Sequence, residues 1–194
     1  NVQRAGPSTG VPTQTEQGDL WQVLGASQGD FPKLIFAASS PLDSFQTIPE
    51  VFNLADKYQL PAIILSDLLI SDETSTINPE LLNMHPVIDR GELITEAGEE
   101  GDNYERYKFT DSGISPRALP GIPGYEHVVA SDEHMPDGVL ISDEFTHPHK
   151  RRAMMEKRQR KMPGLLKDLP PPVIVGDSNA EVTLVGWGST AGVI

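Results

Sequence analysis

Two short apolar runs separated by a helix-forming segment constrain the fold of this chain more than any other feature. The runs at 33–38 and 62–67 are almost continuously apolar, as strands are when both faces of their sheet are covered. The segment between them has the length and polarity of one helix. A strand, a helix and a second strand in this order form a β-α-β unit. The sequence therefore predicts an α/β fold built on a doubly wound parallel sheet.

The helix between these strands has a clear start signal. Ser40 is a preferred N-cap residue, Pro41 suits the first helical position, and Asp43 follows three residues after the cap. We predict that this helix runs through Tyr58. Its predicted core face consists of Leu42, Phe45, Phe52 and Ala55, with Leu54 and Tyr58 beside them.

The middle of the chain lacks a sustained hydrophobic period. Residues 72–106 are rich in acids, Pro, Gly, Ser and Thr, which predicts a solvated or partly disordered loop. With the Pro- and Gly-rich residues that follow, this makes an acidic loop and strap over about 72–142. Residues 143–167 form a basic helix candidate. Because the net charge is -13 and no aromatics interleave the basic residues, a solvated helix or one that pairs with an acidic surface is favoured over nucleic-acid binding.

Composition excludes several classes of function. The sequence has no Cys, so it offers no disulfide, no thiol nucleophile and no thiolate ligand for zinc or iron–sulfur clusters. No apolar run approaches the roughly 20 residues that span a bilayer. No Gly-x-Ser-x-Gly motif is present, and Asp132-Glu133-His134 has the residue types for a metal without a helical pair of ligands. We expect a soluble protein of a reducing compartment, the cytoplasm, with no membrane partner.

The stretch Leu169-Pro170-Pro171-Pro172 is typical of a stiff linker and predicts a domain boundary. Residues 1–168 would then belong to one domain and 173–194 to the start of a second. Because a last strand with no element behind it would expose apolar surface, we expect the natural polypeptide to extend beyond both ends. The strands of the second domain are predicted at 173–175 and 181–185.

The loop from Arg4 to Thr13 is the strongest site candidate. It separates a short strand from a helix, and such loops lie at the carboxyl edge of a sheet, where open α/β folds bind ligands. Its glycines allow close backbone approach, its hydroxyl groups can donate hydrogen bonds, and the Arg4 guanidinium can grip a carboxylate or phosphate. The spacing does not match a phosphate-binding Gly-x-x-x-x-Gly-Lys loop. The residues of this loop are compatible with an anion site and with a purely structural turn.

A set of motifs, in order along the whole chain, resembles the alpha subunit of 2-oxoacid:ferredoxin oxidoreductases, particularly the 2-oxoglutarate type. The longest match is the string from Asn1 to Leu20, which contains Arg-Ala-Gly-Pro-Ser-Thr-Gly and Thr-Glu-Gln-Gly-Asp. Further matches are Phe52–Tyr58, Leu65–Asp67, Tyr107-Lys108, Gly113–Arg117, Asp132–His134, Glu156–Arg158 and Gly186–Thr190.

The resemblance implies a domain organisation. It makes residues 1–168 a partial pyrimidine-binding domain of a thiamine diphosphate enzyme, and 173–194 the first strands of a transketolase C-terminal-like domain. Both domains are doubly wound α/β folds in that family. The family's further substrate loop would lie upstream of Asn1, so this fragment alone is expected to be inactive.

The resemblance also implies a reaction and its partners. Members of the family carry out the oxidative decarboxylation of a 2-oxoacid with coenzyme A and pass the electrons to ferredoxin. Thiamine diphosphate, Mg2+ and the iron–sulfur cluster would be bound mainly by the beta subunit. In this chain the matching substrate-binding residues are Arg4 and Thr13, and no catalytic or metal-binding residue is assigned.

Alternatives of other classes remain open at this point. The substrate could be pyruvate or a branched-chain 2-oxoacid instead of 2-oxoglutarate. The chain could also be a non-catalytic interaction module that has kept the fold. A transketolase-like enzyme is disfavoured by the Gly-Pro-Ser-Thr-Gly loop and the Thr-Glu-Gln-Gly-Asp string after it.

Overall fold

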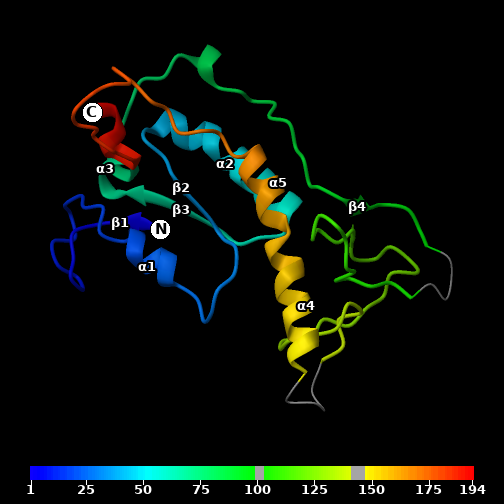
Figure 1. Ribbon diagram of the computed structural model, residues 1–194. Helices are drawn as coiled ribbons and strands as arrows, with labels where there is room; N and C mark the ends of the chain where they lie inside the picture. Colours follow the sequence, from blue (N-terminus) through cyan, green and yellow to red (C-terminus); the bar gives the residue numbers. More distant parts are fainter. Residues whose placement is uncertain (99–102, 141–146) are drawn as a thin grey trace. The chain divides into compact units, whose positions relative to one another are not determined.

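A computed structural model describes residues 1–98, 103–140 and 147–194 (Figure 1). The chain forms two compact units. The first contains residues 1–55, 60–88 and 170–194, and the second contains residues 56–59 and 89–169. Among the described residues, no helix is both long and apolar enough to cross a membrane.

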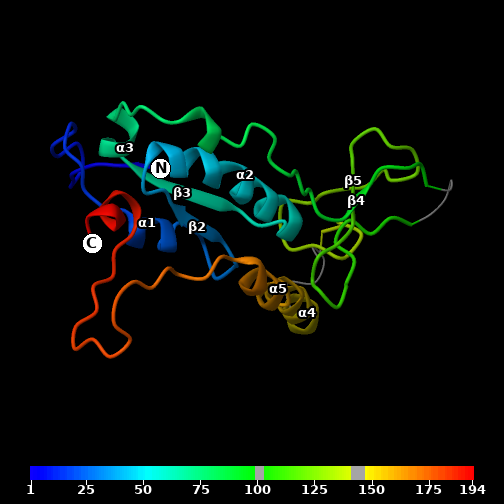
Figure 2. The same ribbon diagram turned by 90° about the horizontal axis from the view of Figure 1, so that it is seen from above.

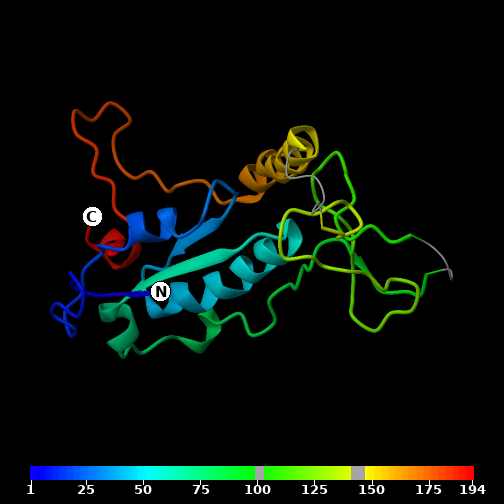
Figure 3. The same cartoon turned by 90° about the horizontal axis from the view of Figure 1, so that it is seen from below.

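A three-stranded parallel sheet is the centre of the first unit. Its strands are β1 (Val2–Gln3), β2 (Leu34–Ala37) and β3 (Ala62–Asp67), in the order β1-β3-β2. The register pairs Phe36 with Ile64 and Gln3 with Asp67. Helices α1 (Leu20–Gly25) and α2 (Pro41–Tyr58) lie on opposite sides of these strands (Figure 3). The prediction of an α/β fold is confirmed.

Helix α2 begins where the sequence predicts. The Ser40 hydroxyl oxygen accepts a hydrogen bond from the Asp43 amide at 3.1 Å, and the Asp43 carboxylate accepts one from the Ser39 amide at 2.7 Å. These bonds satisfy donors that the first helical turn cannot pair internally. The helix ends at Tyr58, and Gln59 then has a positive φ of 51°, a conformation common just after a helix.

The buried face of α2 differs from the one predicted. Val51, Leu54 and Tyr58 are buried, at three- and four-residue spacing, whereas Phe45 and Phe52 are 38% and 69% exposed. Both stripes are apolar, so the helical period cannot choose between them. The orientation of the helix on its neighbours makes that choice, and the prediction that both phenylalanines are core residues was wrong for this chain.

The second unit is built mostly from turns. Its two short strands, β4 (Leu93–Ile94) and β5 (Arg117–Ala118), pair in parallel. Of the acidic segment predicted at 72–106, residues 99–102 lie outside the described residues. In the described part of this segment, the end of α3 (Leu68–Asp72) and η1 (Pro79–Leu81) belong to the first unit and β4 belongs to the second, and the rest has little regular structure.

The basic segment forms two consecutive helices, α4 (Pro148–Gln159) and α5 (Lys161–Asp168). The predicted start at 143–146 lies outside the described residues. Glu133 accepts hydrogen bonds from Arg151 and Arg158. The contacts with Glu133 agree with the expectation of a helix that pairs with acidic groups, whereas Lys157 and Lys161 are only 4% and 8% exposed and are not solvated.

The last 22 residues, all of which the structure describes, contain no β-strand. Val173 and Val175 are each 89% exposed, and the chain stays irregular until the 3-10 helix η2 (Gly188–Val193). The predicted strands at 173–175 and 181–185 are therefore absent here, because a strand forms only where a neighbour can pair with its backbone groups. The predicted domain boundary stays a prediction.

Candidate functional site

The loop that follows β1 lies at the carboxyl edge of the parallel sheet. Figure 2 shows this loop, α3 and η2 at the same end of the first unit. Gln3, only 1% exposed, forms side-chain hydrogen bonds with the strand β3 and with the residues that follow the loop. Its side-chain nitrogen donates to the Ser66 carbonyl at 3.3 Å, and its side-chain oxygen accepts from the Asp19 amide at 3.2 Å. This one buried side chain fixes the loop ends to β3.

Hydrogen bonds across the loop close it into a compact turn. The Ala5 amide donates to the Gln14 carbonyl at 3.0 Å, and the Gly6 amide donates to the Glu16 carboxylate at 3.1 Å. Gly10 has φ +48°, and a methyl group at this position would overlap the Ala5 carbonyl oxygen. The turn therefore requires glycine at residue 10.

A cavity of about 600 Å³ opens beside this loop. The half-buried Arg4 lines it, and its guanidinium donates one hydrogen bond to the Thr9 carbonyl. Among the described residues the Arg4 guanidinium makes no other hydrogen bond, so its remaining N–H groups can donate to a ligand. The residues that line the cavity around Arg4 include Gly6, Ser8, Glu16, Asp19 and Gln22.

Two carboxylates share the cavity with Arg4, and both already have partners. Glu16 accepts from the Gly6 amide, and Asp19 accepts from the Asn1 side-chain amide at 2.7 Å. The cavity thus has one guanidinium and two hydrogen-bonded acids. It can bind a carboxylate at Arg4, while the two acids are already hydrogen-bonded within the chain.

The structure does not bring the second predicted substrate residue to the first. Thr13 is exposed and is not among the residues that line the cavity. The loop turns back on itself between Val11 and Gln14, whose backbones are hydrogen-bonded at 3.2 Å, and Thr13 lies in that turn. Its role in substrate binding stays a prediction.

Sequence reasoning missed a contact made by Gln17, which lies between two residues that line the cavity. The Gln17 side-chain nitrogen donates to the Trp187 carbonyl at 2.7 Å, and its side-chain oxygen accepts from the Thr190 hydroxyl at 3.0 Å. The two residues next to Gln17, Glu16 and Gly18, both line the cavity. The Gln in Thr-Glu-Gln-Gly-Asp was the available signal, but nothing local in the sequence names its partner.

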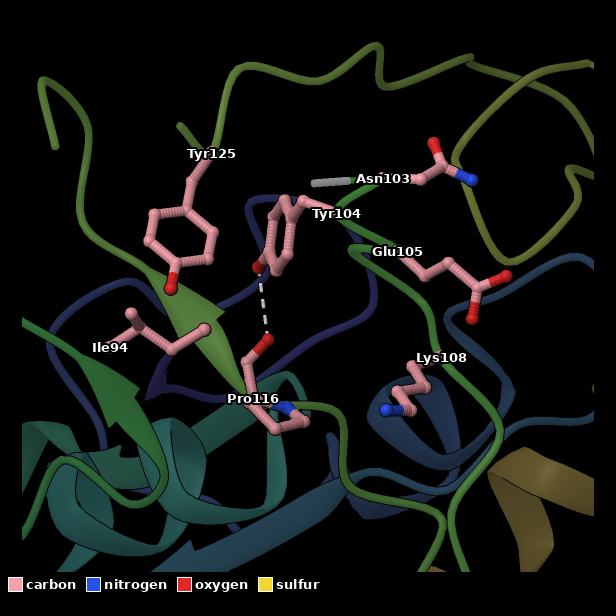
Figure 4. A pocket seen from close by; sticks show the side chains of 7 residues that line it. All are labelled: Ile94, Asn103, Tyr104, Glu105, Lys108, Pro116 and Tyr125. Carbon is pink, nitrogen blue, oxygen red and sulfur yellow. Dashed lines mark hydrogen bonds between the residues drawn. The ribbon is translucent and has the colours of Figure 1, made fainter. Parts of the chain in front are cut away.

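A smaller cavity of about 250 Å³ lies in the second unit (Figure 4). Tyr104 and Tyr125 form one wall, with their rings 5.2 Å apart in an edge-to-face arrangement. The Tyr104 hydroxyl donates to the Pro116 carbonyl at 2.9 Å and accepts from the Ala118 amide at 3.1 Å. Because the Tyr104 hydroxyl is hydrogen-bonded to the backbone around β5, we interpret this aromatic pair as structural.

The residue types that suggested a metal have other partners. The His134 ring stacks on Tyr107 with centroids 3.8 Å apart, and burial lowers its pKa. Glu133 forms an ion pair with Arg158 at 2.7 Å. Within the described ranges, no three His, Asp or Glu side chains come together as a metal site.

Comparisons with known proteins agree on one family. Residues 1–156 match the family described as pyruvate flavodoxin/ferredoxin oxidoreductase, thiamine diphosphate-binding. The alpha subunit of 2-oxoacid:ferredoxin oxidoreductase 1 from Sulfurisphaera tokodaii is 37% identical over 98% of this chain and 30% of its own length. The 2-oxoglutarate oxidoreductase subunit KorA from Mycobacterium tuberculosis is 37% identical over 100% of this chain and 28% of its own.

A third relative, the alpha subunit of 2-oxoacid:ferredoxin oxidoreductase 2 from Aeropyrum pernix, is 36% identical over 96% of this chain and 28% of its own length. The chain spans a little under a third of the length of these relatives. The family match, in contrast, covers most of the chain, from residue 1 to residue 156. The chain therefore belongs to the pyruvate flavodoxin/ferredoxin oxidoreductase family, as a thiamine-diphosphate-binding domain of the alpha-subunit type.

Proposed function

We propose that this chain is part of the alpha subunit of a 2-oxoacid:ferredoxin oxidoreductase and that its loop after β1 binds the 2-oxoacid. The observation that carries the proposal is the position of Arg4. Its guanidinium lines a cavity at the carboxyl edge of the sheet and uses one of its donors on the loop itself. A guanidinium with free donors in a partly enclosed cavity is suited to a carboxylate.

The proposed reaction converts a 2-oxoacid anion and coenzyme A into an acyl-coenzyme A, CO2 and one proton, while the two electrons released reduce two ferredoxin molecules. In this reaction Arg4 would hold the substrate carboxylate and fix its orientation. The loop and its glycine turn would keep Arg4 in place, since an ordered loop loses less entropy when substrate binds. Thr13 would contribute a hydroxyl group if the loop closes on the substrate.

We place the redox and vitamin cofactors mainly on the beta subunit. The sequence has no Cys to hold an iron–sulfur cluster, and no three His, Asp or Glu side chains among the described residues come together as a metal site. Thiamine diphosphate, when bound, would supply the electron sink for decarboxylation. The partners of this chain are then the beta subunit and ferredoxin, in a reducing compartment such as the cytoplasm.

2-Oxoglutarate is the proposed substrate because a relative that is 37% identical over the whole chain carries that substrate in its name. Other relatives of the same identity are named only for 2-oxoacids. Pyruvate and branched-chain 2-oxoacids differ from 2-oxoglutarate in lacking a second carboxylate. Comparing the three substrates therefore asks whether the assembled site binds one carboxylate or two.

The test is acceptor reduction by the complete alpha-beta complex. We expect a low-potential acceptor to be reduced when 2-oxoglutarate, coenzyme A and thiamine diphosphate are present. Arg4→Ala should raise KM for the 2-oxoacid about 10- to 100-fold and lower turnover, because a charge-assisted hydrogen bond contributes about 1.5 to 3 kcal/mol. Arg4→Lys should keep part of the affinity. Arg152→Ala, which removes an exposed arginine of α4, is the matched control.

The outcomes separate the two functional classes. A folded Arg4→Ala complex with unchanged KM would remove Arg4 from the substrate site. A complex that assembles with its beta subunit but reduces no acceptor with any of the three 2-oxoacids would support the non-catalytic interaction module instead.

A further inference from the structure

Two adjacent residues just after the Arg4–Thr13 loop, Glu16 and Gln17, form hydrogen bonds with different parts of the chain. Glu16 accepts a hydrogen bond from the Gly6 amide and so joins the two stems of the loop. Gln17 donates to the Trp187 carbonyl, 170 residues further along the chain. The dipeptide therefore connects the Arg4 loop on one side to the turn that opens η2 on the other.

The Gln17 carboxamide uses both of its polar atoms on this turn. Its nitrogen donates to the Trp187 carbonyl at 2.7 Å, and its oxygen accepts from the Thr190 hydroxyl at 3.0 Å. The Thr190 hydroxyl also lies 2.8 Å from the Trp187 carbonyl oxygen. A carboxamide is the side chain that can donate and accept in this way, so a carboxylate of the same size would lose the bond to Trp187.

The backbone of the turn is shaped to meet Gln17. Gly188 has φ +61°, and a methyl group added there would lie 2.7 Å from the Gln17 side-chain nitrogen. The same methyl group would lie 3.9 Å from the Ala37 side chain, at the carboxyl end of β2. The turn and the Arg4 loop therefore occupy the same edge of the sheet, and glycine at residue 188 allows them to approach.

We propose that Gln17 is a positioning residue, which fixes the Arg4 loop to the turn at 187–190 and thereby sets the shape of the substrate cavity. This inference rests on the proposed function for the identity of the substrate, but not for the contact itself. Glu16 and Gly18 line the cavity on either side of Gln17, so releasing Gln17 frees the cavity wall to move. Residues 173–194, which we also propose to open a second domain, then help to order the site of the first.

The decisive experiment is a double-mutant cycle in the full alpha-beta complex. Gln17→Ala should raise KM for 2-oxoglutarate about 3- to 10-fold with kcat changed less than about twofold, the factor expected for one or two hydrogen bonds. Thr190→Val should have a smaller effect in the same direction. Because both changes break one network, the double variant should be no worse than Gln17→Ala alone. Gln28→Ala, an exposed glutamine of the same unit, should leave KM unchanged.

A second readout needs no activity and covers variants that assemble poorly. Hydrogen exchange of the backbone amides at 188–190 should become faster in Gln17→Glu than in wild type, because this isostere loses the donor to Trp187. Unchanged KM in Gln17→Ala, additive effects in the cycle, or unchanged exchange in Gln17→Glu would each overturn the proposal. If the wild-type complex turned over no 2-oxoacid, the proposed function would fail, and the exchange measurement would still decide on the Gln17 contact.

Discussion

Tyr58 and Asp168, which are 110 residues apart in sequence, are joined by a 2.7 Å hydrogen bond from the phenol to the carboxylate. Lys57 forms an ion pair with the same carboxylate at 2.8 Å. Burial and the hydrogen bond to Asp168 raise the pKa of Tyr58 to about 12. Within the second unit, the Asp168 carboxylate thus links the last turn of α2 to the end of α5.

We expect Tyr58→Phe to lower the melting temperature of the subunit by about 2 to 4 °C, since one hydrogen bond is lost and little volume changes. Tyr125→Phe is the matched control, because its ring packs against Tyr104 in the same unit. Thermal unfolding followed by circular dichroism measures both. Equal shifts for the two variants would show that the bond to Asp168 adds nothing.

The two faces of α2 should respond differently to truncation. Leu54 is 6% exposed, so Leu54→Ala should cost about 2 to 4 kcal/mol of unfolding free energy. Phe52 is 69% exposed, and Phe52→Ala should stay within about 0.5 kcal/mol in the isolated subunit. Urea unfolding compares the two variants directly. A larger loss of unfolding free energy for Phe52→Ala than for Leu54→Ala would show that the core face predicted from the sequence is the buried one.

Gly113 should tolerate substitution less well than Gly121, although both have positive φ, +77° and +91°. A methyl group at Gly113 would overlap the Lys157 carbonyl oxygen, whereas one at Gly121 meets no atom within 4 Å. Gly121→Ala should cost about 1 kcal/mol for its left-handed backbone. Gly113→Ala should cost about 1 to 3 kcal/mol more through steric overlap, measured by chemical denaturation. Similar losses at both positions would contradict the close approach of α4 to Gly113.

The two buried lysines should make stability depend on pH. Burial lowers the pKa values of Lys157 and Lys161 from 10.5 to about 8. Between pH 8 and 10.5 the unfolded chain keeps protons that the folded chain has lost, so stability should rise with pH in this range. Below about pH 8 both states are protonated and the burial penalty is fully present. Measurements should stay below pH 10, because Tyr58 has an ordinary pKa of 10.0 in the unfolded chain and about 12 in the folded one, so its ionisation on unfolding lowers stability near that pH.

An exposed lysine of α5, the helix that also contains Lys161, provides the control for this pH effect. The double variant Lys157→Met/Lys161→Met should lose most of the rise in unfolding free energy between pH 7.5 and 9.5, while Lys167→Met, an exposed lysine, should keep it. The expected amplitude is about 1 kcal/mol or more, because one pKa unit corresponds to about 1.4 kcal/mol. Identical pH profiles for wild type and the double variant would show that these ammonium groups are not buried in solution.

The local sequence determined much of the first unit. Ser40, Pro41 and Asp43 fixed the start of α2, and the two apolar runs became the parallel strands β2 and β3. The glycine-rich loop with Arg4 was found at the predicted edge of the sheet. Each of these features depends on residues within a few positions of one another, so backbone preference and hydrophobic period carry the information.

Other features depend on contacts that no local pattern contains. Strands were predicted at 181–185 from an alternating pattern, but the backbone there has no neighbour to pair with. The exposed Phe52 and the buried Leu54 are two apolar positions on one helix, and only packing distinguishes them. Lys157 and Lys161 lie in a cluster of basic residues, and such clusters are usually solvated. Their burial was therefore not predicted from the sequence.

The sequence by itself determined the family, the β-α-β unit and the arginine that we assign to the substrate. Only the tertiary structure decided which helix face is buried and which far segment supports the site, because side chains such as Gln17 find partners at distances along the chain that sequence spacing cannot encode. Gln17 donates to the Trp187 carbonyl and accepts from the Thr190 hydroxyl because the sheet brings both segments to one edge.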